Sequence, residues 1–202
     1  MALSEIQLVE GPAVELSLAT VKQYLRVAYS EDDSLITMMI QQAREQCEQW
    51  CNRKFITQTW NAWYDKIDKR FELPCCPIQN VLSFNLVYLQ ESITLQQNQD
   101  YYLMGNFDKF VILTATTYNL PPGFSLADDL WRFNLNIQFT CGYGDSYTDV
   151  PMGIQMAIMK TVAANYDLRA NVQGTSRQGV IGFLELPNDA RSLLKPYKLV
   201  TI

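Results

Sequence analysis

The chain has 202 residues, 48% of them hydrophobic and 12% aromatic, and a formal net charge of −5; this composition supports a folded core and excludes a disordered chain. The sequence contains no histidine, which removes the usual general base near neutral pH and the commonest metal ligand. Its net negative charge argues against a protein that binds nucleic acid by neutralising the phosphates. Without a signal-peptide pattern or an apolar run of roughly 20 residues, we expect a cytosolic chain that does not enter a membrane.

Two helices are predicted in the first quarter of the chain. Residues 18–27 are the first ordered element expected, because Ser17 stands at an N-cap position and apolar residues recur after it at helical spacing. Ser30 is predicted to cap the second helix, and Asp33 three residues later completes a capping box.

The second helix has one apolar stripe and one polar face. The stripe contains Leu35, Ile36, Met39, Ile40, Ala43, Cys47, Trp50 and Cys51. The polar face is expected to contain Gln41, Gln42, Arg44, Glu45, Glu48 and Gln49. Because both cysteines lie on the apolar stripe, they are expected to pack in the core rather than to bind a metal.

A period of two over residues 55–145 predicts an inserted, half-buried antiparallel sheet. The clearest strand is expected to face inward at Trp131, Phe133, Leu135, Ile137, Phe139 and Cys141. A second strand is expected to turn Leu82, Phe84, Leu86 and Tyr88 to one face. Residues 116–130 have the Pro, Gly and Asp content of a projecting loop, whose role the sequence leaves open.

The helical period returns over residues 149–170, with Asp149 as the expected cap. Met156 and Met159 widen the apolar face of this helix, which predicts packing on two sides or against another subunit. The tail, residues 171–202, begins as a Gly/Ser loop and then contains a short helix over residues 189–195, capped by Asn188.

Together these elements predict an α+β fold. Two N-terminal helices and one long C-terminal helix (residues 17–53 and 149–170) form a helical core, the antiparallel sheet is inserted between them, and an extended tail ends the chain. Because no Pro- or Gly-rich linker separates these parts, we expect one domain over residues 1–202.

No group of side chains predicts catalysis. Cys141 lacks a histidine base and fits the inward alternation of its strand. The adjacent carboxylates Asp32 and Asp33, and Asp128 and Asp129, have the setting of solvated groups. The five cysteines fit neither a disulfide framework nor a zinc site. We therefore expect no enzyme, cofactor or metal, which leaves an assembly protein or an aromatic-rich accessory domain that binds carbohydrate or peptide.

Three blocks of the sequence resemble the head–tail connector (adaptor) proteins of tailed phages, prophages and gene transfer agents. The first, residues 16–60, matches at LSLATVKQYLRV and then at Asp32, Asp33, Leu35, Ile36, Met39, Ile40, Ala43, Arg44, Glu48, Arg53, Phe55, Ile56, Gln58, Thr59 and Trp60. The second matches at Val150, Pro151, Ile154, Ala157, Val162, Ala163, Tyr166 and Arg169. The third is ARSLLKPYKLV near the end. Residues 65–130 match only as a strand-rich region.

The resemblance implies a structural virion protein at the head–tail interface, assembled in the host cytoplasm. It implies a homo-oligomeric ring of about twelve copies beneath the portal protein. Such a ring would extend the DNA channel, let DNA pass without specific binding, and dock a stopper or tail-completion protein.

The resemblance also implies that the C-terminal segment reaches the portal and orders on docking. Leu193, Leu194, Pro196 and Tyr197 would be its anchors; alternatively, these side chains cap the chain's own core. Met156 and Met159 are the candidates for contact between subunits.

Overall fold

The computed structural model describes residues 3–12, 15–65, 70–88, 91–104, 110–113, 134–171 and 186–199. The chain divides into two compact units. The sheet unit contains Met1–Ala13 and Ile56–Tyr143, and the helical unit contains Val14–Phe55 and Gly144–Ile202. That residues 1–202 form one connector domain stays a prediction.

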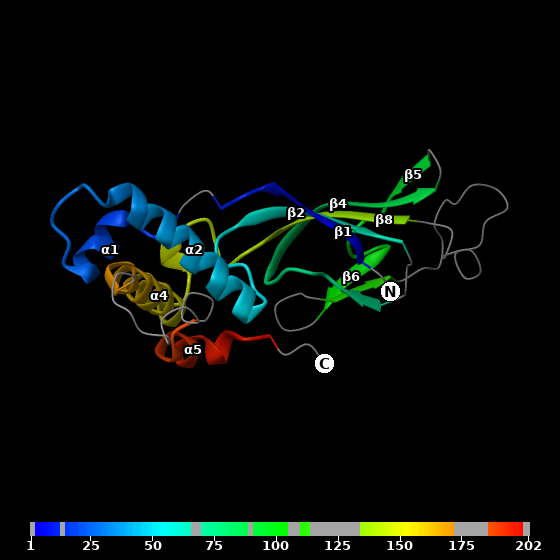
Figure 1. Ribbon diagram of the computed structural model, residues 1–202. Coiled ribbons are helices and arrows are strands. Elements are labelled where there is room, and N and C mark those ends of the chain that lie inside the picture. The colour runs from blue at the N-terminus through cyan, green and yellow to red at the C-terminus, as the bar shows by residue number, and fades with distance from the viewer. Residues whose placement is uncertain are drawn as a thin grey trace. The chain divides into compact units, whose positions relative to one another are not determined.

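The predicted α+β class is confirmed. The helical unit contains α1 (Leu18–Leu25), α2 (Asp33–Cys51), the 3-10 helix η2 (Tyr147–Asp149), α4 (Met152–Asn171), α5 (Asn188–Leu194) and the 3-10 helix η4 (Lys195–Tyr197). Within this unit α2 and α5 both pack against α4 (Figure 1). The short helix of the tail thus starts and ends within one residue of the prediction. The predicted extended tail is described only over residues 186–199.

The sheet unit contains a five-stranded antiparallel sheet with the strand order β1-β2-β8-β4-β5 (Figure 1). Its strands are β1 (Leu3–Glu10), β2 (Gln58–Tyr64), β8 (Asn134–Cys141), β4 (Ile78–Tyr88) and β5 (Glu91–Thr94). A second sheet has the order β3-β7-β6, made of β3 (Arg70–Glu72), β7 (Phe110–Leu113) and β6 (Tyr101–Met104).

The alternation predicted for the clearest strand is confirmed in its described part. The side chains of Leu135, Ile137, Phe139 and Cys141 on β8 are fully buried. They pack with residues of the neighbouring strands, among them Ala62, Tyr64, Phe84, Leu86 and Tyr101. The aromatic rings of Tyr64, Phe84, Tyr101 and Phe139 therefore build the core of this unit. Trp131, Phe133 and the loop predicted over residues 116–130 lie outside the described residues.

Among the side chains that the structure describes, strand β4 differs from its predicted pattern at Leu82. Leu82 was expected to face inward with Phe84 and Leu86, but its side chain is 52% exposed. The pairing of β4 with β8 shifts register between Val81 and Ser83. A β-bulge inserts one extra residue and resets the alternation, so Val81 contacts the core and Leu82 faces solvent.

The first ordered element is strand β1, not the helix at residue 18 as predicted. Its register with β2 shifts between Leu3 and Glu5, and again between Leu8 and Glu10. These shifts break the strict period of two by which a strand is recognised in a sequence.

The predicted helix caps at Ser30 and Asp149 are also wrong. Helix α2 begins at Asp33, and the acids at its start bind neighbouring helices: Asp33 pairs with Lys22 of α1, and Asp32 accepts a 2.7 Å hydrogen bond from the Tyr166 hydroxyl of α4. Asp149 ends η2 and accepts a hydrogen bond from the backbone N–H of Ser146. Both carboxylates at the start of α2 therefore contact other helices. Tertiary packing, rather than local capping, decides where these side chains lie.

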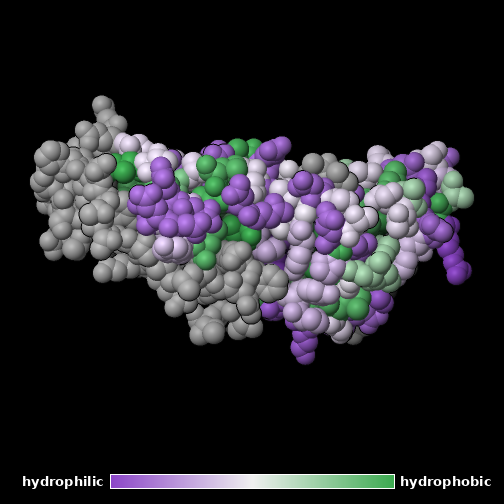
Figure 2. Space-filling model, turned by 180° about the vertical axis from the view of Figure 1, so that it is seen from behind, coloured by the Kyte–Doolittle hydropathy of each residue, from purple (hydrophilic) through white to green (hydrophobic). Residues whose placement is uncertain are grey.

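None of the described helices is long and apolar enough to cross a bilayer. On the visible face in Figure 2, hydrophobic residues of the described surface lie among hydrophilic ones. The large hydrophobic side chains with the most exposed surface are Leu3, Ile6, Leu8, Val9, Tyr24, Tyr29, Met38, Leu82, Tyr102 and Met152. Four of these ten belong to strand β1.

Candidate functional site

The helical unit has two features that distinguish it from a plain helical core: a buried ionic network on α2 and a C-terminal segment fastened to the same helix. Helix α2 buries its apolar stripe at Ile36, Ile40, Ala43, Cys47 and Cys51. It also buries Arg44 and Glu48, which are only 6% and 2% exposed. Their predicted place on the polar face is therefore wrong.

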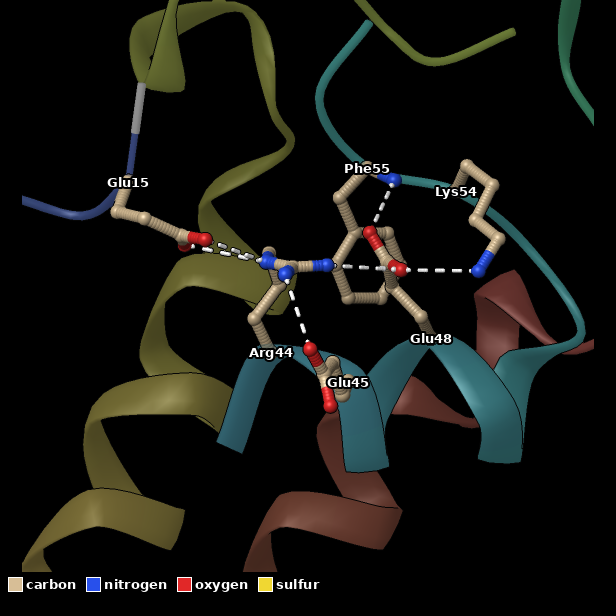
Figure 3. A network of polar contacts seen from close by, with 6 residues as sticks. All are labelled: Glu15, Arg44, Glu45, Glu48, Lys54 and Phe55. Carbon is tan, nitrogen blue, oxygen red and sulfur yellow. Dashed lines mark hydrogen bonds and ion pairs between the residues drawn. The ribbon is translucent and has the colours of Figure 1, made fainter. Parts of the chain in front are cut away.

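Arg44 lies between two carboxylates of the helical unit (Figure 3). Its Nε donates to both oxygens of Glu15, at 2.9 and 3.1 Å, and its Nη1 lies 3.0 Å from Oε2 of Glu48. A third, exposed carboxylate, Glu45, lies 3.4 Å from Nη2. Because Arg presents its donors in a planar fork, it can join several carboxylates in one fixed geometry.

Glu48 completes the network on the far side of Arg44 (Figure 3). Its Oε1 accepts the backbone N–H of Phe55 at 3.0 Å, and its Oε2 lies 3.3 Å from the Lys54 ammonium. Every group drawn in Figure 3 thus has a partner, which is the condition under which buried charges are tolerated.

The electrostatics of the network follow from burial and pairing. Burial lowers the pKa of the Arg44 guanidinium, but the carboxylates of Glu48 and Glu15 raise it more, so its pKa is raised overall. Burial raises the pKa of Glu15, and the neighbouring Arg44 only partly offsets this. The network therefore stays charged on Arg44, while Glu15 holds its proton more readily than an exposed glutamate.

The network joins the chain segments at which the polypeptide first enters and first leaves the helical unit. Glu15 follows directly after the unit's first residue, and Phe55 is the last residue before the chain passes into the sheet unit. Arg44 and Glu48, one helical turn apart on α2, bind one segment each. The geometry makes this network a structural clamp.

We expect Glu15 to give stability a specific pH dependence. Its pKa in the folded chain lies above the ordinary value of 4.5, so between these two values the folded state binds more protons than the unfolded state. The unfolding free energy contributed by Glu15 must then fall as pH rises. Wild type and Glu15→Gln should be compared by urea unfolding from about pH 4 to about pH 7. The stability of the wild type relative to the variant should decrease, and a constant or rising difference would contradict the proposed burial of Glu15.

The C-terminal segment is fastened to the end of α2 by three contacts. The Nε of Arg53 donates to the backbone carbonyl of Tyr197 at 2.6 Å, and the backbone N–H of Leu199 donates to the carbonyl of Cys51 at 2.9 Å. The Lys198 ammonium lies 4.5 Å from the centre of the Trp50 ring, within cation–π range. Residues 197–199 are thus held by both backbone and side-chain contacts.

The Tyr197 ring lies against the start of α4. A Cβ at Gly153 would lie 3.1 Å from the ring's Cε2, a tight contact that would require the ring to move by a few tenths of an ångström.

The six interface candidates from the sequence lie in α4, α5 and η4. Leu194 is fully buried and Met159 is nearly so. Leu193, Tyr197 and Met156 are half-buried, and Pro196 is exposed. The structure brings α5 and α4 together, but contact of these residues with a portal or another subunit stays a prediction.

Two kinds of reactive site, a metal cluster and an exposed thiol, are not found among the described residues. No group of three or more acidic or cysteine side chains among them could hold a metal ion. All five cysteines are buried, and burial raises the pKa of Cys47 and Cys51 to about 12. A thiol with so high a pKa carries almost no thiolate at neutral pH and is a poor nucleophile.

Sequence reasoning missed Glu15 and Lys54 as parts of the clamp, and it placed Arg44 and Glu48 on the wrong face. One signal could have found the central pair. The connector pattern that the sequence resembles contains Arg44, Glu48 and Arg53, and all three polar side chains are buried. A polar residue that belongs to a family pattern and stands next to an apolar stripe is a candidate for a buried partner.

Comparison with known proteins agrees with the resemblance. The solved structures most similar in fold include the neck of an empty gene transfer agent (GTA) particle computed with C6 symmetry, with a TM-score of 0.73 and 18% identity over 98% of this chain and 97% of that chain. A chain from the virion of a native gene transfer agent particle gives 0.73, 16% identity, and 98% and 96% coverage. A chain from the neck of a native GTA particle computed with C12 symmetry gives 0.67, 18% identity, and 97% coverage of both chains.

A search of curated proteins finds no match. The sequence profile of the head completion proteins, in contrast, matches residues 16–200, which include the clamp and the C-terminal segment. The resemblance drawn from the sequence is therefore confirmed, and the chain belongs to the head completion protein family.

Proposed function

We propose that the protein is a head–tail connector in the neck of a phage-like particle. Copies of the chain would form a ring of about twelve beneath the portal protein. The ring would extend the channel through which DNA passes and would present a surface to a stopper or tail-completion protein. The observation that carries this proposal is the match of nearly the whole chain to the head completion proteins.

The solved structures of similar fold support the ring. They come from GTA necks computed with C6 and C12 symmetry, and each covers almost the whole of this chain. Cyclic symmetry of this kind repeats a subunit around one closed axis, as in a cyclic oligomer.

The charge of the chain supports a channel through which DNA moves without binding. With a net charge of −5, the ring would repel the phosphate backbone at long range. A head completion protein is a structural class of protein and not a class of enzyme; the absence of catalytic activity stays a prediction.

Within this proposal, the exposed part of the C-terminal segment is the contact with the portal. Pro196 is exposed beside the half-buried Leu193 and Tyr197, whereas Leu194 belongs to the core of the helical unit. The solvent-accessible part of a half-buried aromatic or leucine side chain can fill a pocket on a partner protein. Met156, half-buried on α4, is the candidate for contact between subunits.

Electron microscopy and mass measurement of the full-length protein, alone and mixed with the portal protein of the same particle, test the proposal. We expect rings on the portal, with a mass that corresponds to about twelve copies. A protein that remains monomeric at high concentration and does not bind the portal would contradict the proposed function.

A further inference from the structure

Strand β1 is an edge strand that is exposed along its whole length. All eight residues from Leu3 to Glu10 are exposed. β1 pairs with β2 on one side and stands at the end of the strand order, so its other edge has no strand beside it among the described residues. Such an edge presents a row of backbone donors and acceptors that can pair with another strand.

One face of β1 continues the hydrophobic face of the sheet. Leu3, Ile6 and Leu8 lie opposite Tyr64, Ala62 and Trp60 of β2. These three β2 residues in turn lie opposite the buried Leu135, Ile137 and Phe139 of β8. Directly paired residues share a face of a sheet, yet Leu3, Ile6 and Leu8 remain 42%, 36% and 46% exposed.

The usual protection of an edge strand is weak here. Natural edges often carry lysine, proline or an inward-pointing charge that prevents further pairing. β1 has the sequence LSEIQLVE, with neither lysine nor proline, and its hydrophobic face contains three aliphatic side chains. Its protective features among the described residues are two exposed glutamates, Glu5 and Glu10, and two register shifts against β2.

Within the described part of the sheet unit, β5 is a second open edge, at the opposite end of the strand order. Because all four neighbouring pairs are antiparallel, the first and fifth strands run in the same direction. On β5, Ile93 lies opposite the buried Leu86 and shares the hydrophobic face, while Ser92 lies opposite Val87 on the other face. The two edges therefore present matching faces and a common direction.

We propose that β1 of one copy pairs with β5 of the next copy in the ring, so that the five-stranded sheets join edge to edge. This rests on the proposed ring. A cyclic ring needs a heterologous interface made of two different surfaces of each subunit, and one sheet with two different open edges supplies both. Rotation by roughly 30° between neighbouring copies of a twelvefold ring keeps the two strands close to one direction, so the added pair is parallel. It would place Ile93 beside the exposed aliphatic side chains of β1.

Cross-linking between introduced cysteines tests this contact. Gln7 of β1 and Ser92 of β5 are both exposed and lie on the polar face of the sheet. Within one chain they are separated by four strand spacings, about 19 Å at ~4.8 Å each. A bismaleimide that spans about 10 Å tolerates a register offset of two residues, ~7 Å, and cannot join the two cysteines of one chain. The native cysteines are all buried, so the wild type is the background control.

With rings assembled on the portal, the double variant Gln7→Cys/Ser92→Cys should give a ladder of covalent multimers. Each single variant should give none. Cross-linking by Gln7→Cys alone would show that two β1 strands pair with each other, and would overturn the proposal. Rings without a ladder would overturn it as well, and would leave the proposed function intact. A ladder without closed rings would support the contact and contradict the ring. Monomers without a ladder would overturn both.

A charge on the hydrophobic face of β1 gives an independent readout. Leu8→Lys should lower the assembled fraction by at least about tenfold, because the ammonium would be buried beside Ile93 of the next copy. Gln7→Lys, the matched control on the polar face, should assemble like the wild type. Since both positions are exposed, both variants should keep the monomer's unfolding midpoint. Equal assembly of the two folded variants would overturn the proposal.

Discussion

Replacement of Arg44 by alanine should destabilise the helical unit by about 3–5 kcal/mol. The change removes the guanidinium that pairs with the carboxylate of Glu48, whose side chain is 1% exposed. It also removes the ion-pair partner of Glu15. Removing one member of a buried ionic network is strongly destabilising, because the remaining charge stays desolvated without its partner. Replacing the whole network by apolar side chains changes stability much less. Urea unfolding followed by circular dichroism at the helical signal measures the loss.

Glu45→Ala is the matched control for this variant. Glu45 contacts the same guanidinium at 3.4 Å, but its side chain is 61% exposed, so its removal should change stability by less than about 0.5 kcal/mol. The double variant Arg44→Met/Glu48→Leu should recover much of the loss, since it removes both central charges together. If Arg44→Ala unfolds like Glu45→Ala, the clamp is not buried in solution as described.

Periodicity predicted the elements whose buried face is evident from the spacing of neighbouring residues. The apolar stripe of α2 and the alternation of Leu135, Ile137 and Phe139 on β8 are properties of neighbouring residues, and each is decided by a helical or strand period. The class of the fold and the buried thiols of α2 followed from these two patterns alone. The family could be inferred because its patterns combine these periods with fixed polar positions such as Arg44 and Arg53.

The features that the sequence did not predict depend on partners far along the chain. Arg44 is buried because Glu15 lies beside it, 29 residues earlier, and no period encodes that pair. Strand β1 forms by pairing with residues about 50 to 60 positions later. Leu82 is exposed because a bulge between β4 and β8 resets the alternation. In each case a tertiary contact decides the outcome between local alternatives of similar free energy.

The second large effect concerns the C-terminal helix. Leu194→Ala should destabilise the helical unit by about 2–5 kcal/mol, because a fully buried leucine is replaced and a cavity is left where α5 packs against α4. Pro196→Ala changes an exposed residue two positions later and should cost at most about 1 kcal/mol through the unfolded chain. Thermal or urea unfolding of the two variants measures the difference.

The same pair of variants separates folding from docking. If the C-terminal segment docks on the portal through its exposed side, Pro196→Ala should weaken portal binding although the protein stays folded. Leu194→Ala should bind the portal normally at a temperature where it is still folded, since Leu194 has no surface to offer a partner. Wild-type portal binding by Pro196→Ala would count against the proposed anchor, and wild-type stability of Leu194→Ala would contradict the packing of α5. Because the two residues stand in one short segment, a result that splits them assigns one side of that segment to the chain's own core and the other to its partner.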